Sequence, residues 1–587
     1  MSSLYTGVSG LTTNQRGLTA TSHNLSNVET KGYVRQQVVL SDSYYSNLGT
    51  NHISYLQVGA GATVAAIRQE REVFLDKSYR QESGRKSFYE SQYEASSEIE
   101  DILGETEGVA FQNSVSSLWE SLSELCKEPE SIVTRTSFIQ TAVSFIERAE
   151  IVYKQIEDYQ VSLNEQIETY VNRINEIADK IYDLNYKIRR YEAAGFENAN
   201  DLRDQRNLLL DELGGYAKIS YKEQANGVVT VSLEGSALVN EDLVYHIGTK
   251  SMDTNADLIE PYWPNLGEIP VFSLDPLPAS AANTDIGALK GLLLARGDKV
   301  ARYTDIPVAP TEEEYTEAGY FDEDGYKAAM EKYEDEVKEY NLKIDASVVM
   351  SVESQFDTLI HGIVTTINDI LCPNKEVLTA EGETIQILDT ENCPCGMDIN
   401  ETIGNGIFNR KSVDRYEKTT VTLEIDGIWQ DVEVWKYNEE DPTDNYSLFT
   451  VGEIEVNSAI LKDPSVIPLS KQGGTGDYSV EICEQLLTEW QTPFSTLTPN
   501  EYNKNNFDDF YTEMIGALGT KGEKFKNVFE SQESLVNSVD NQRQAKIAVS
   551  SDEELTNIIK FQQGYNANAR YISTLDEMLE HLLTQLG

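Results

Sequence analysis

The sequence predicts a mainly α protein with a β-containing middle, folded as a nested set of domains. Two observations support this fold class. All 15 prolines lie between Pro129 and Pro499, so both ends lack the residue that breaks helix interiors. Apolar residues recur at helical spacing towards both ends, whereas the middle contains short segments that alternate as strands do. We therefore expect long helices at the two ends and a mixed α+β region between them.

The two ends each carry an apolar stripe along one face of a predicted helix. Such a helix is marginal alone, because burial of that face supplies most of its stability. The stripes therefore need a partner: they pair with each other as a coiled coil, or they pack against neighbouring copies. Periodicity alone favours pairing within the chain. The stripe positions are Leu4, Val8, Leu11, Leu18 and Leu25 at the first end, and Leu555, Ile558, Tyr565, Ile572, Leu579, Leu582 and Leu586 at the second.

Longer helical segments lie inside these ends and predict a bundle built from both halves of the chain. Residues 163–188 keep an unbroken apolar heptad series. A second helix is expected over about 74–103, and a third stripe spans residues 525–539. Gly214 and Gly215 mark the predicted exit from the bundle, because glycine commonly ends a helix.

Between these helical parts the sequence changes to strand patterns and helical inserts. Residues 219–239 and 419–435 alternate as short strands, and Asp426-Gly427 predicts the turn of a hairpin in the second segment. Residues 311–340 are acidic and rich in tyrosine, which is typical of a solvated helical insert. Residues 346–371 repeat apolar residues along one helical face.

These patterns predict three nested domains. The boundaries are 1–60 with 550–587 for the terminal helical polymerisation domain, 61–215 with 500–549 for the long helical bundle, and 216–499 for the outer α+β domain. The outer domain contains an acidic insert at about 300–345 and a β-rich insert at about 375–470. The nesting places both termini at one pole of the molecule and the middle at the other.

The formal net charge is −51, and the isoelectric point is about 4.4. A surface this negative repels nucleic acid and anionic lipid, so we expect neither as a partner. No apolar run is long enough for a transmembrane helix, and the start MSSLYTGVSG has neither the basic nor the apolar part of a Sec-type leader. If the protein works outside the cell, it must leave by a route that cleaves no leader.

The sequence contains no recognisable catalytic or metal-binding motif. The five cysteines are irregularly spaced and odd in number, so no disulfide framework is predicted. Cys393 and Cys395 would supply only half of a metal site, and no histidine lies nearby. None of the five histidines has metal-ligand spacing, and no nucleophile elbow, Walker loop or Rossmann fingerprint is present. We therefore predict that the chain is not an enzyme and holds no metal or cofactor.

Residues 22–36 read SHNLSNVETKGYVRQ and follow the first leucine stripe directly. Asparagine, serine and glycine residues turn the chain here; Asn24 and Asn27 lie early in the segment, Gly32 supplies backbone freedom and Tyr33 offers an anchor after the turn. This motif resembles the N-terminal signature shared by axial proteins of the bacterial flagellum, a group that includes rod, hook and hook-associated proteins. The motif alone does not separate these proteins from one another.

Three further segments are similar to the hook-associated protein 1 family in particular. They are VSSDEELTNIIKFQQGYNANAR at 549–570, DLRDQRNLL at 201–209 and FTVGEIEVN at 449–457. Residues at about 300–345 and 375–445 match nothing in that family, which leaves the shape of the outer domain open.

The resemblance implies a structural adaptor between the hook and the filament, exported by the flagellar type III route and located outside the cell. Its implied partners are further copies of itself, the hook protein, a second junction protein and the filament cap, with a cytoplasmic export chaperone that binds the C-terminal stripe. In this context the apolar stripes are expected to pack between subunits as a self-assembly seam.

Three other functions compete with this interpretation. Within the same class, the chain is a hook or filament subunit. From other classes, it carries a secreted enzyme or a surface adhesin in its middle region.

Overall fold

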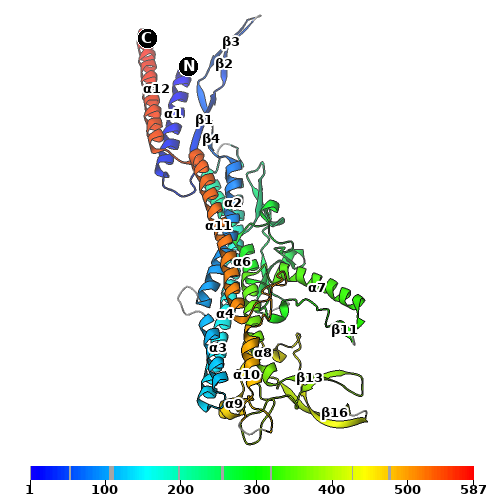
Figure 1. Cartoon of the computed structure of the whole chain (residues 1–587). Helices are drawn as coiled ribbons and strands as arrows, with labels where there is room; N and C mark the ends of the chain where they lie inside the picture. The colour runs from blue at the N-terminus through cyan, green and yellow to red at the C-terminus, as the bar shows by residue number, and fades with distance from the viewer. Residues whose placement is uncertain are drawn as a thin grey trace.

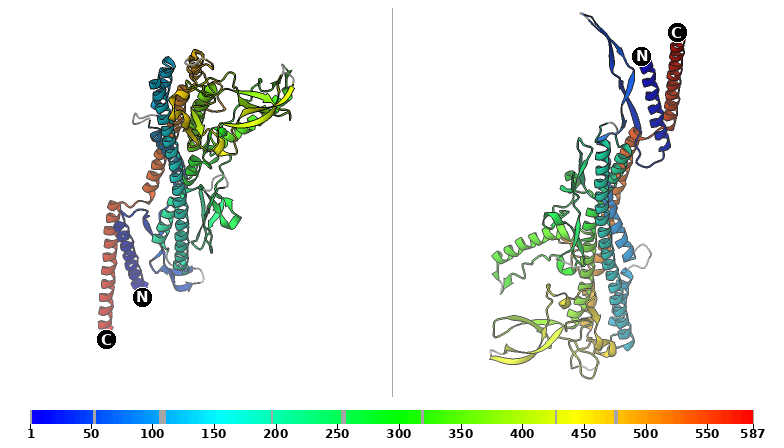
Figure 2. Two further views of the ribbon diagram at one scale, coloured as in Figure 1. Left: turned by 90° about the horizontal axis from the view of Figure 1, so that it is seen from below. Right: turned by 180° about the vertical axis from the view of Figure 1, so that it is seen from behind.

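The computed structural model shows a mainly α protein with several small β-sheets. The described residues are 2–51, 54–104, 111–195, 198–252, 257–317, 320–425, 428–473 and 477–586. The molecule is elongated, and both termini lie at the same end of it (Figure 1). The other two views in Figure 2 show the same separation between the terminal helices and the yellow strands of the middle region.

The terminal end consists of two helices and a long β-hairpin arm. Helix α1 (Ser2–Ser26) runs antiparallel to helix α12 (Ser551–Leu586). The arm has two parts, the antiparallel pair β1 and β4 beside α1 and the antiparallel pair β2 and β3 beyond it. Its strands are β1 (Gln36–Asp42), β2 (Tyr45–Asn51), β3 (Ser54–Gly59) and β4 (Ala62–Gln69).

Long helices from both halves of the chain form the central bundle, as the sequence predicted. Helices α2 and α11 pack along each other although they lie at opposite ends of the sequence. The predicted heptad series lies in α4, where all of its members are buried except the half-buried Tyr170. The bundle helices are α2 (Val73–Leu103), α3 (Gln112–Lys127), α4 (Ile132–Glu192), α5 (Asn200–Tyr216) and α11 (Phe507–Ile547).

Gly214 and Gly215 do not follow the bundle helix as predicted; they lie inside its last turn, because α5 continues to Tyr216. The reason is close packing rather than termination. A methyl group on Gly84 of α2 would lie 2.5 Å from the carbonyl oxygen of Gly214, so the two backbones meet at this point. Glycine is needed where backbones approach this closely.

The middle region is built around helices α6 (Ala288–Arg296) and α8 (Val348–Leu371). Helix α8 is buried on almost all sides, not only along the predicted apolar face. Its buried carboxylates are held by backbone donors: Glu353 accepts from the N–H of Ala301, and Asp357 accepts from the N–H groups of Tyr303 and Val451. Burial raises the pKa of both carboxyls above the ordinary value.

Small antiparallel sheets flank these helices. The strand order is β5-β6-β7 in the first, β10-β9-β8 in the second and β13-β14-β17-β16 in the third. The predicted strands at 219–239 and the predicted hairpin at 419–435 are both confirmed, although the turn at Asp426-Gly427 lies outside the described residues. The strands are β5 (Ile219–Glu223), β6 (Val229–Leu233), β7 (Ser236–Val239), β8 (Gly248–Ser251), β9 (Ile259–Trp263), β10 (Ile269–Pro270), β13 (Asn374–Leu378), β14 (Thr384–Leu388), β16 (Tyr416–Ile425) and β17 (Ile428–Tyr437).

Two arms project sideways from the rod: helix α7 (Glu323–Lys343), and the hairpin of β16 and β17 (Figure 1). Helix α7 is the predicted acidic insert, and most of its length is exposed to solvent. The remaining elements are β11 (Thr316–Glu317), β12 (Tyr320–Phe321), β15 (Phe408–Arg410), β18 (Ile454–Val456), α9 (Ser458–Lys462), α10 (Val480–Gln491) and the 3₁₀ turns Pro264–Leu266, Ser280–Ala282, Tyr303–Asp305, Asn445–Ser447 and Pro464–Val466.

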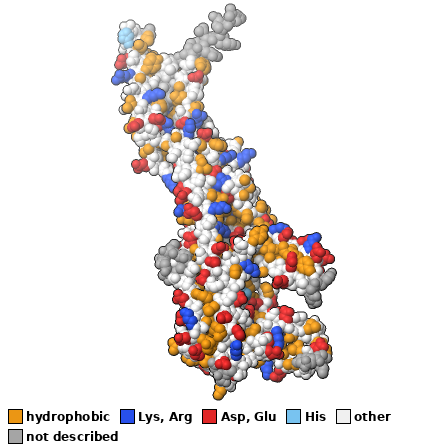
Figure 3. Space-filling view, in the orientation of Figure 1, with side chains coloured by type: hydrophobic (Ala, Val, Ile, Leu, Met, Phe, Trp, Pro, Cys, Tyr) orange, Lys and Arg blue, Asp and Glu red, His pale blue; other side chains and the backbone are white. Residues whose placement is uncertain are grey.

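The surface carries charge along its whole length. Figure 3 shows acidic and basic side chains interspersed over one face of the rod and its arms. Among the described residues, none of the helices combines the length and the apolarity that a bilayer crossing requires.

Candidate assembly site at the paired termini

Helices α1 and α12 touch along small residues. A methyl group placed on Gly17 would lie 2.6 Å from the ring of Phe561, and one on Gly7 would lie 2.9 Å from the side chain of Ile572. Real side-chain contacts are longer than this, so the two helices are too close for any larger residue at these positions. Glycine therefore sets the distance between the terminal helices.

The seam contains the same pair of residues on each helix. On α1, the side-chain amide of Asn14 donates to the carbonyl of Gly10 at 2.7 Å; on α12, that of Asn568 donates to the carbonyl of Gly564 at 2.8 Å. Each asparagine lies against the glycine of the other helix. The amide donors are thus satisfied inside a close helix contact, where an unpaired polar group would be costly.

The predicted leucine stripe flanks this seam instead of forming it. Leu11, Leu18, Leu25, Ile558 and Tyr565 are half-buried, and Ile572 lies against Gly7. The exposed members are Leu4, Val8, Leu555, Leu579 and Leu582, and Leu586 ends α12. Packing of these residues between copies stays a prediction. The signal that sequence reasoning missed is the spacing of Gly7, Gly10, Asn14, Gly17, Thr21 and Asn24, which alternates by three and four.

Helix α12 extends past the start of α1. Gly17 lies opposite Phe561 and Gly7 opposite Ile572, so the same antiparallel register places the first residues of α1 opposite residues near 576. Figure 1 and the right-hand view of Figure 2 show the C-terminus beyond the N-terminus. The overhang, residues 577–586, exposes Met578, Leu579, Leu582 and Leu583, the last with 73% of its surface accessible.

The side chain of Asn24 makes four hydrogen bonds where the end of α1 meets the start of α12. Its amide donates to the carbonyl of Gln36 at 2.9 Å and to Oε2 of Glu554 at 3.1 Å. Its oxygen accepts from the hydroxyl of Tyr33 at 2.8 Å and from the N–H of Gln36 at 3.0 Å. Both amide hydrogens and both lone pairs are therefore used. Gly32, with φ of 79°, allows the turn that brings Tyr33 back to this point.

The other marked asparagine of the motif has a local role. The amide of Asn27 donates to the carbonyl of His23 at 2.9 Å, one turn earlier, and its oxygen accepts from Thr30. Asn27 therefore shapes the end of α1, whereas Asn24 joins α1 to other elements.

Glu554 connects α12 to the same motif. Its carboxylate accepts from the guanidinium of Arg35 at 2.9 Å, and Arg35 also pairs with Glu553 at 3.0 Å. The backbone N–H of Arg35 donates to the carbonyl of Ile547, at the end of α11. At the start of α12, the hydroxyl of Ser550 accepts from the N–H of Glu553 at 3.5 Å.

Asp204 connects the motif to the bundle. It lies on α5, in the DLRDQRNLL segment, and accepts from the N–H of Val34 at 3.1 Å and from the amide of Gln69 at 2.6 Å. Burial raises the pKa of Asp204 to about 7; these hydrogen bonds and Arg71, 3.8 Å away, act in the opposite direction, and Asp201 adds a further rise. Arg206 of the same segment is buried and bonds Asn185 and the carbonyl of Gly227.

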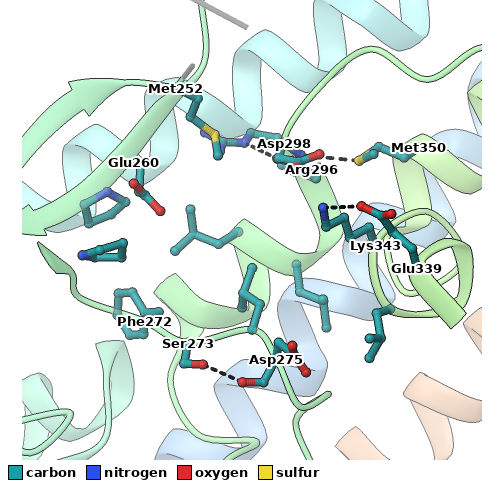
Figure 4. Close-up of a pocket in the computed structure, with 17 residues that line it drawn as sticks. Met252, Glu260, Phe272, Ser273, Asp275, Arg296, Asp298, Glu339, Lys343 and Met350 are labelled. Carbon is teal, nitrogen blue, oxygen red and sulfur yellow. Dashed lines mark hydrogen bonds and ion pairs between the residues drawn. The ribbon is translucent and has the colours of Figure 1, made fainter. Parts of the chain in front are cut away.

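An apolar cavity lies far from this site, between β9, α6 and α7. Its volume is about 560 Å³, and it is lined mainly by apolar side chains such as Phe272 and Leu293 (Figure 4). Two of the basic groups in view have partners: Lys343 pairs with Glu339 at 2.7 Å, and Arg296 donates to Asn164 at 2.5 Å.

One cluster in the middle region has the residue types of a catalytic site. The ring of His361 stacks on Tyr303 with centroids 3.8 Å apart, and its Nε2 lies 3.0 Å from Glu440. Glu440 also accepts from the hydroxyl of Tyr303 and from the N–H of Phe449. These bonds join α8 to the segment before β18, so His361 is a packed histidine.

Two family models match the chain. The helical domain of flagellar hook-associated protein FlgK matches residues 96–306, and the C-terminal model of the flagellar basal body rod FlgEFG proteins matches residues 546–586. The second match covers all of α12, including Glu554, which contacts Asn24 and Arg35 of the N-terminal motif. The chain is therefore a structural protein of the flagellar axial group.

Similarity over the full length narrows this class. Flagellar hook-associated protein 1 of Bacillus subtilis (strain 168) is 24% identical over 589 residues, covering 100% of this chain and 98% of the relative. Its counterpart in Escherichia coli (strain K12) is 23% identical over 99% and 100% of the two chains. The hook junction protein FlgK from Burkholderia pseudomallei, a solved structure, aligns with 81% of this chain and 100% of its own at a TM-score of 0.46 and 12% identity. The resemblance to the hook-associated protein 1 family is confirmed: this is a flagellar hook-associated structural protein.

The glycine seam gives a first testable prediction. Gly17→Leu should force α1 and α12 apart, weakening their pairing by about 1–3 kcal/mol, the usual cost of overpacking. Hydrogen exchange followed by mass spectrometry should show faster exchange of the α1 amides and unchanged exchange in α4. Gly516→Leu on α11 is the matched control, because an added Cβ there meets no atom within 4 Å. Unchanged protection of α1 in Gly17→Leu would contradict the seam.

The buried carboxyl of Asp204 predicts a pH dependence. Its pKa is higher in the folded chain than the ordinary 3.8, so the folded state binds the proton more tightly. Its contribution to stability is fully present below pH 4 and is lost as the pH rises through about 7. Asp204→Asn, which stays neutral, should therefore gain stability relative to the native chain between pH 5 and pH 8 in urea unfolding. If the difference in unfolding free energy between Asp204→Asn and the native chain were equal at pH 5 and pH 8, this prediction would be refuted.

Proposed function

We propose that this protein is the adaptor between the hook and the filament, and that its paired terminal helices form the part that assembles. The observation that supports this most directly is the overhang of α12. Met578, Leu579, Leu582 and Leu583 lie on a helix end that has no counterpart on α1. Full burial of one such side chain contributes about 1.5–3 kcal/mol, so several per subunit supply a driving force for association.

We also propose the nested division of the chain given by the sequence. The terminal domain comprises residues 1–60 with 550–587, the bundle 61–215 with 500–549, and the outer domain 216–499. The β1–β4 pairing extends the first unit to about residue 69, because β4 packs against α1. The bundle then acts as a rigid spacer that holds the outer arms away from the assembling end.

The proposed partners follow from this placement. Copies of the chain occupy the exposed apolar face of the terminal helices, and the hook protein, a second junction protein and the filament cap contact the assembly at its two ends. The chain functions outside the cell. We infer no catalytic role, because the cavity of Figure 4 is mainly apolar and the His361 cluster joins structural elements.

Charge substitution in the stripe tests the assembly role. Leu579→Asp and Leu11→Asp should each leave the bundle folded, as judged by circular dichroism, and prevent incorporation into flagella. Val133→Asp is the control, because Val133 is an apolar residue with 77% exposure on the bundle, away from the terminal helices. Gold-labelled antibody should place the native chain at the boundary between hook and filament. Label along the whole filament would favour a filament subunit, and normal incorporation of both stripe variants would exclude the assembly role.

The C-terminal helix is also the proposed site for the export chaperone. An amphipathic helix with an apolar face is the type of ligand that binds in a groove of a partner. Removal of residues 550–587 should abolish binding to the purified chaperone in titration calorimetry, whereas Val133→Asp should bind normally. If the truncated chain still bound the chaperone, the chaperone site would lie outside residues 550–587.

A further inference from the structure

Four of the five cysteines lie in two pairs whose members are far apart in the sequence. The first pair joins α3 and α10, which pack antiparallel at the end of the rod away from the termini (Figure 1). The rings of Trp119 and Trp490 stack between these helices with centroids 5.6 Å apart. Seven residues after Trp119 comes Cys126, and seven before Trp490 comes Cys483. Two helical turns in each direction therefore bring the two cysteines to the same contact line, where each thiol shifts the pKa of the other.

The second pair lies near the end of α8. Cys372 is the residue that follows the helix, and the thiol of Cys393 lies 3.6 Å from the carbonyl oxygen of the preceding Leu371. The thiols of Cys372 and Cys393 are close enough that each shifts the pKa of the other. Both side chains are buried, with exposures of 0% and 2%.

A buried arginine accompanies each pair. Arg135 is fully buried near Cys483, and Arg415 is 4% exposed near Cys393. Within the described part of the chain, Nη2 of Arg135 and Nη1 of Arg415 have no hydrogen-bond partner. The neighbouring thiol has the largest effect and lowers the pKa of Cys483 and of Cys393; Arg135 and Arg415 add a smaller lowering, and burial acts in the opposite direction. Each pair therefore contains one thiol that ionises more readily than an isolated buried cysteine does.

We propose that these two pairs are oxidation sites that close as the disulfides Cys126–Cys483 and Cys372–Cys393. The oxidant is a low-molecular-weight disulfide. One thiolate of a pair attacks it, forms a mixed disulfide and releases the first small thiolate. The second cysteine then loses its proton and displaces the other small thiolate. In total, two protein thiols and one small disulfide give one protein disulfide and two small thiols.

The physiological setting of this chemistry rests on the proposed location outside the cell, where disulfides persist. The reducing cytoplasm keeps the four thiols free before export. Once closed, the first disulfide links α3 to α10 and encloses the whole outer region between residues 126 and 483. The second links the end of α8 to the loop that precedes β15. Both crosslinks strengthen the end of the rod opposite the assembling helices.

The fifth cysteine supplies an internal control. The thiol of Cys395 lies 3.5 Å from the carbonyl oxygen of Ser470 and belongs to neither pair, so Cys395 should remain reduced. The two pairs should also differ in rate. Cys126 is half-buried and reachable by a small disulfide, whereas Cys372 and Cys393 are buried and react only when the region opens.

The experiment uses the purified full-length chain, first reduced and then exposed to oxidised glutathione. After denaturation and alkylation, mass spectrometry should find one alkylated cysteine, Cys395, where the reduced chain shows five. Peptide mapping should identify both predicted links, with Cys126–Cys483 forming first. Oxidation should raise the melting temperature of the native chain.

Variants distinguish the predicted pairing from unspecific oxidation. Cys126→Ser should leave Cys483 and Cys395 alkylated and lose the part of the melting shift due to the first link. Cys395→Ser should leave no alkylated cysteine after oxidation, and its melting temperature should equal that of the oxidised native chain. Five alkylated cysteines after oxidation, or a link that includes Cys395, would overturn the proposal. This readout needs no flagellum, so it can fail while the junction assignment stands.

Discussion

The bonding of Asn24 sets the arrangement of both chain ends. One buried side chain uses its four hydrogen-bonding positions to hold the end of α1, the start of β1 and the first turn of α12 together. Arg35 extends this contact to the end of α11, and Asp204 extends it to α5. Because Asn24, Glu554 and Asp204 are buried, loss of one partner leaves others unsatisfied, which costs more than the bond itself contributes. The N-terminal motif is therefore a junction between elements from four parts of the sequence.

Much of the fold could be predicted because its periodicity is strong. The heptads at 163–188 became the buried face of α4, and the absence of proline agrees with the helices α1 and α12. The same proline-free N-terminal part also contains the strands β1 to β4, which the helical expectation missed. The terminal seam was harder to predict, because leucine stripes dominate a hydrophobicity pattern and glycines add nothing to it. Gly7, Gly10 and Gly17 matter through the volume that they lack, which becomes evident only when the opposing helix is present.

Contacts between distant residues could not be predicted from the sequence for a different reason. The motif at 22–36 pointed to Asn24 and Tyr33, but nothing in one sequence indicates that Glu554 or Asp204 completes the same network. Cysteine spacing likewise did not indicate that Cys126 and Cys483 lie close together, because their proximity depends on the register of two antiparallel helices. The side arms at α7 and at β16–β17 were identified as elements, but their direction depends on packing against α8 and its neighbours.

The chain crosses between the terminal helices and the bundle twice, at residues 70–72 and 548–550. Asp76 ties the two crossings together, because it accepts from Arg71 beside the first and pairs with Arg543, which precedes the second, at 3.6 Å. A single connecting segment could rotate about its own backbone bonds, but two segments that are both held by the same buried carboxylate cannot rotate in this way. Rotation of the bundle about its long axis is therefore passed to the terminal helices as torque.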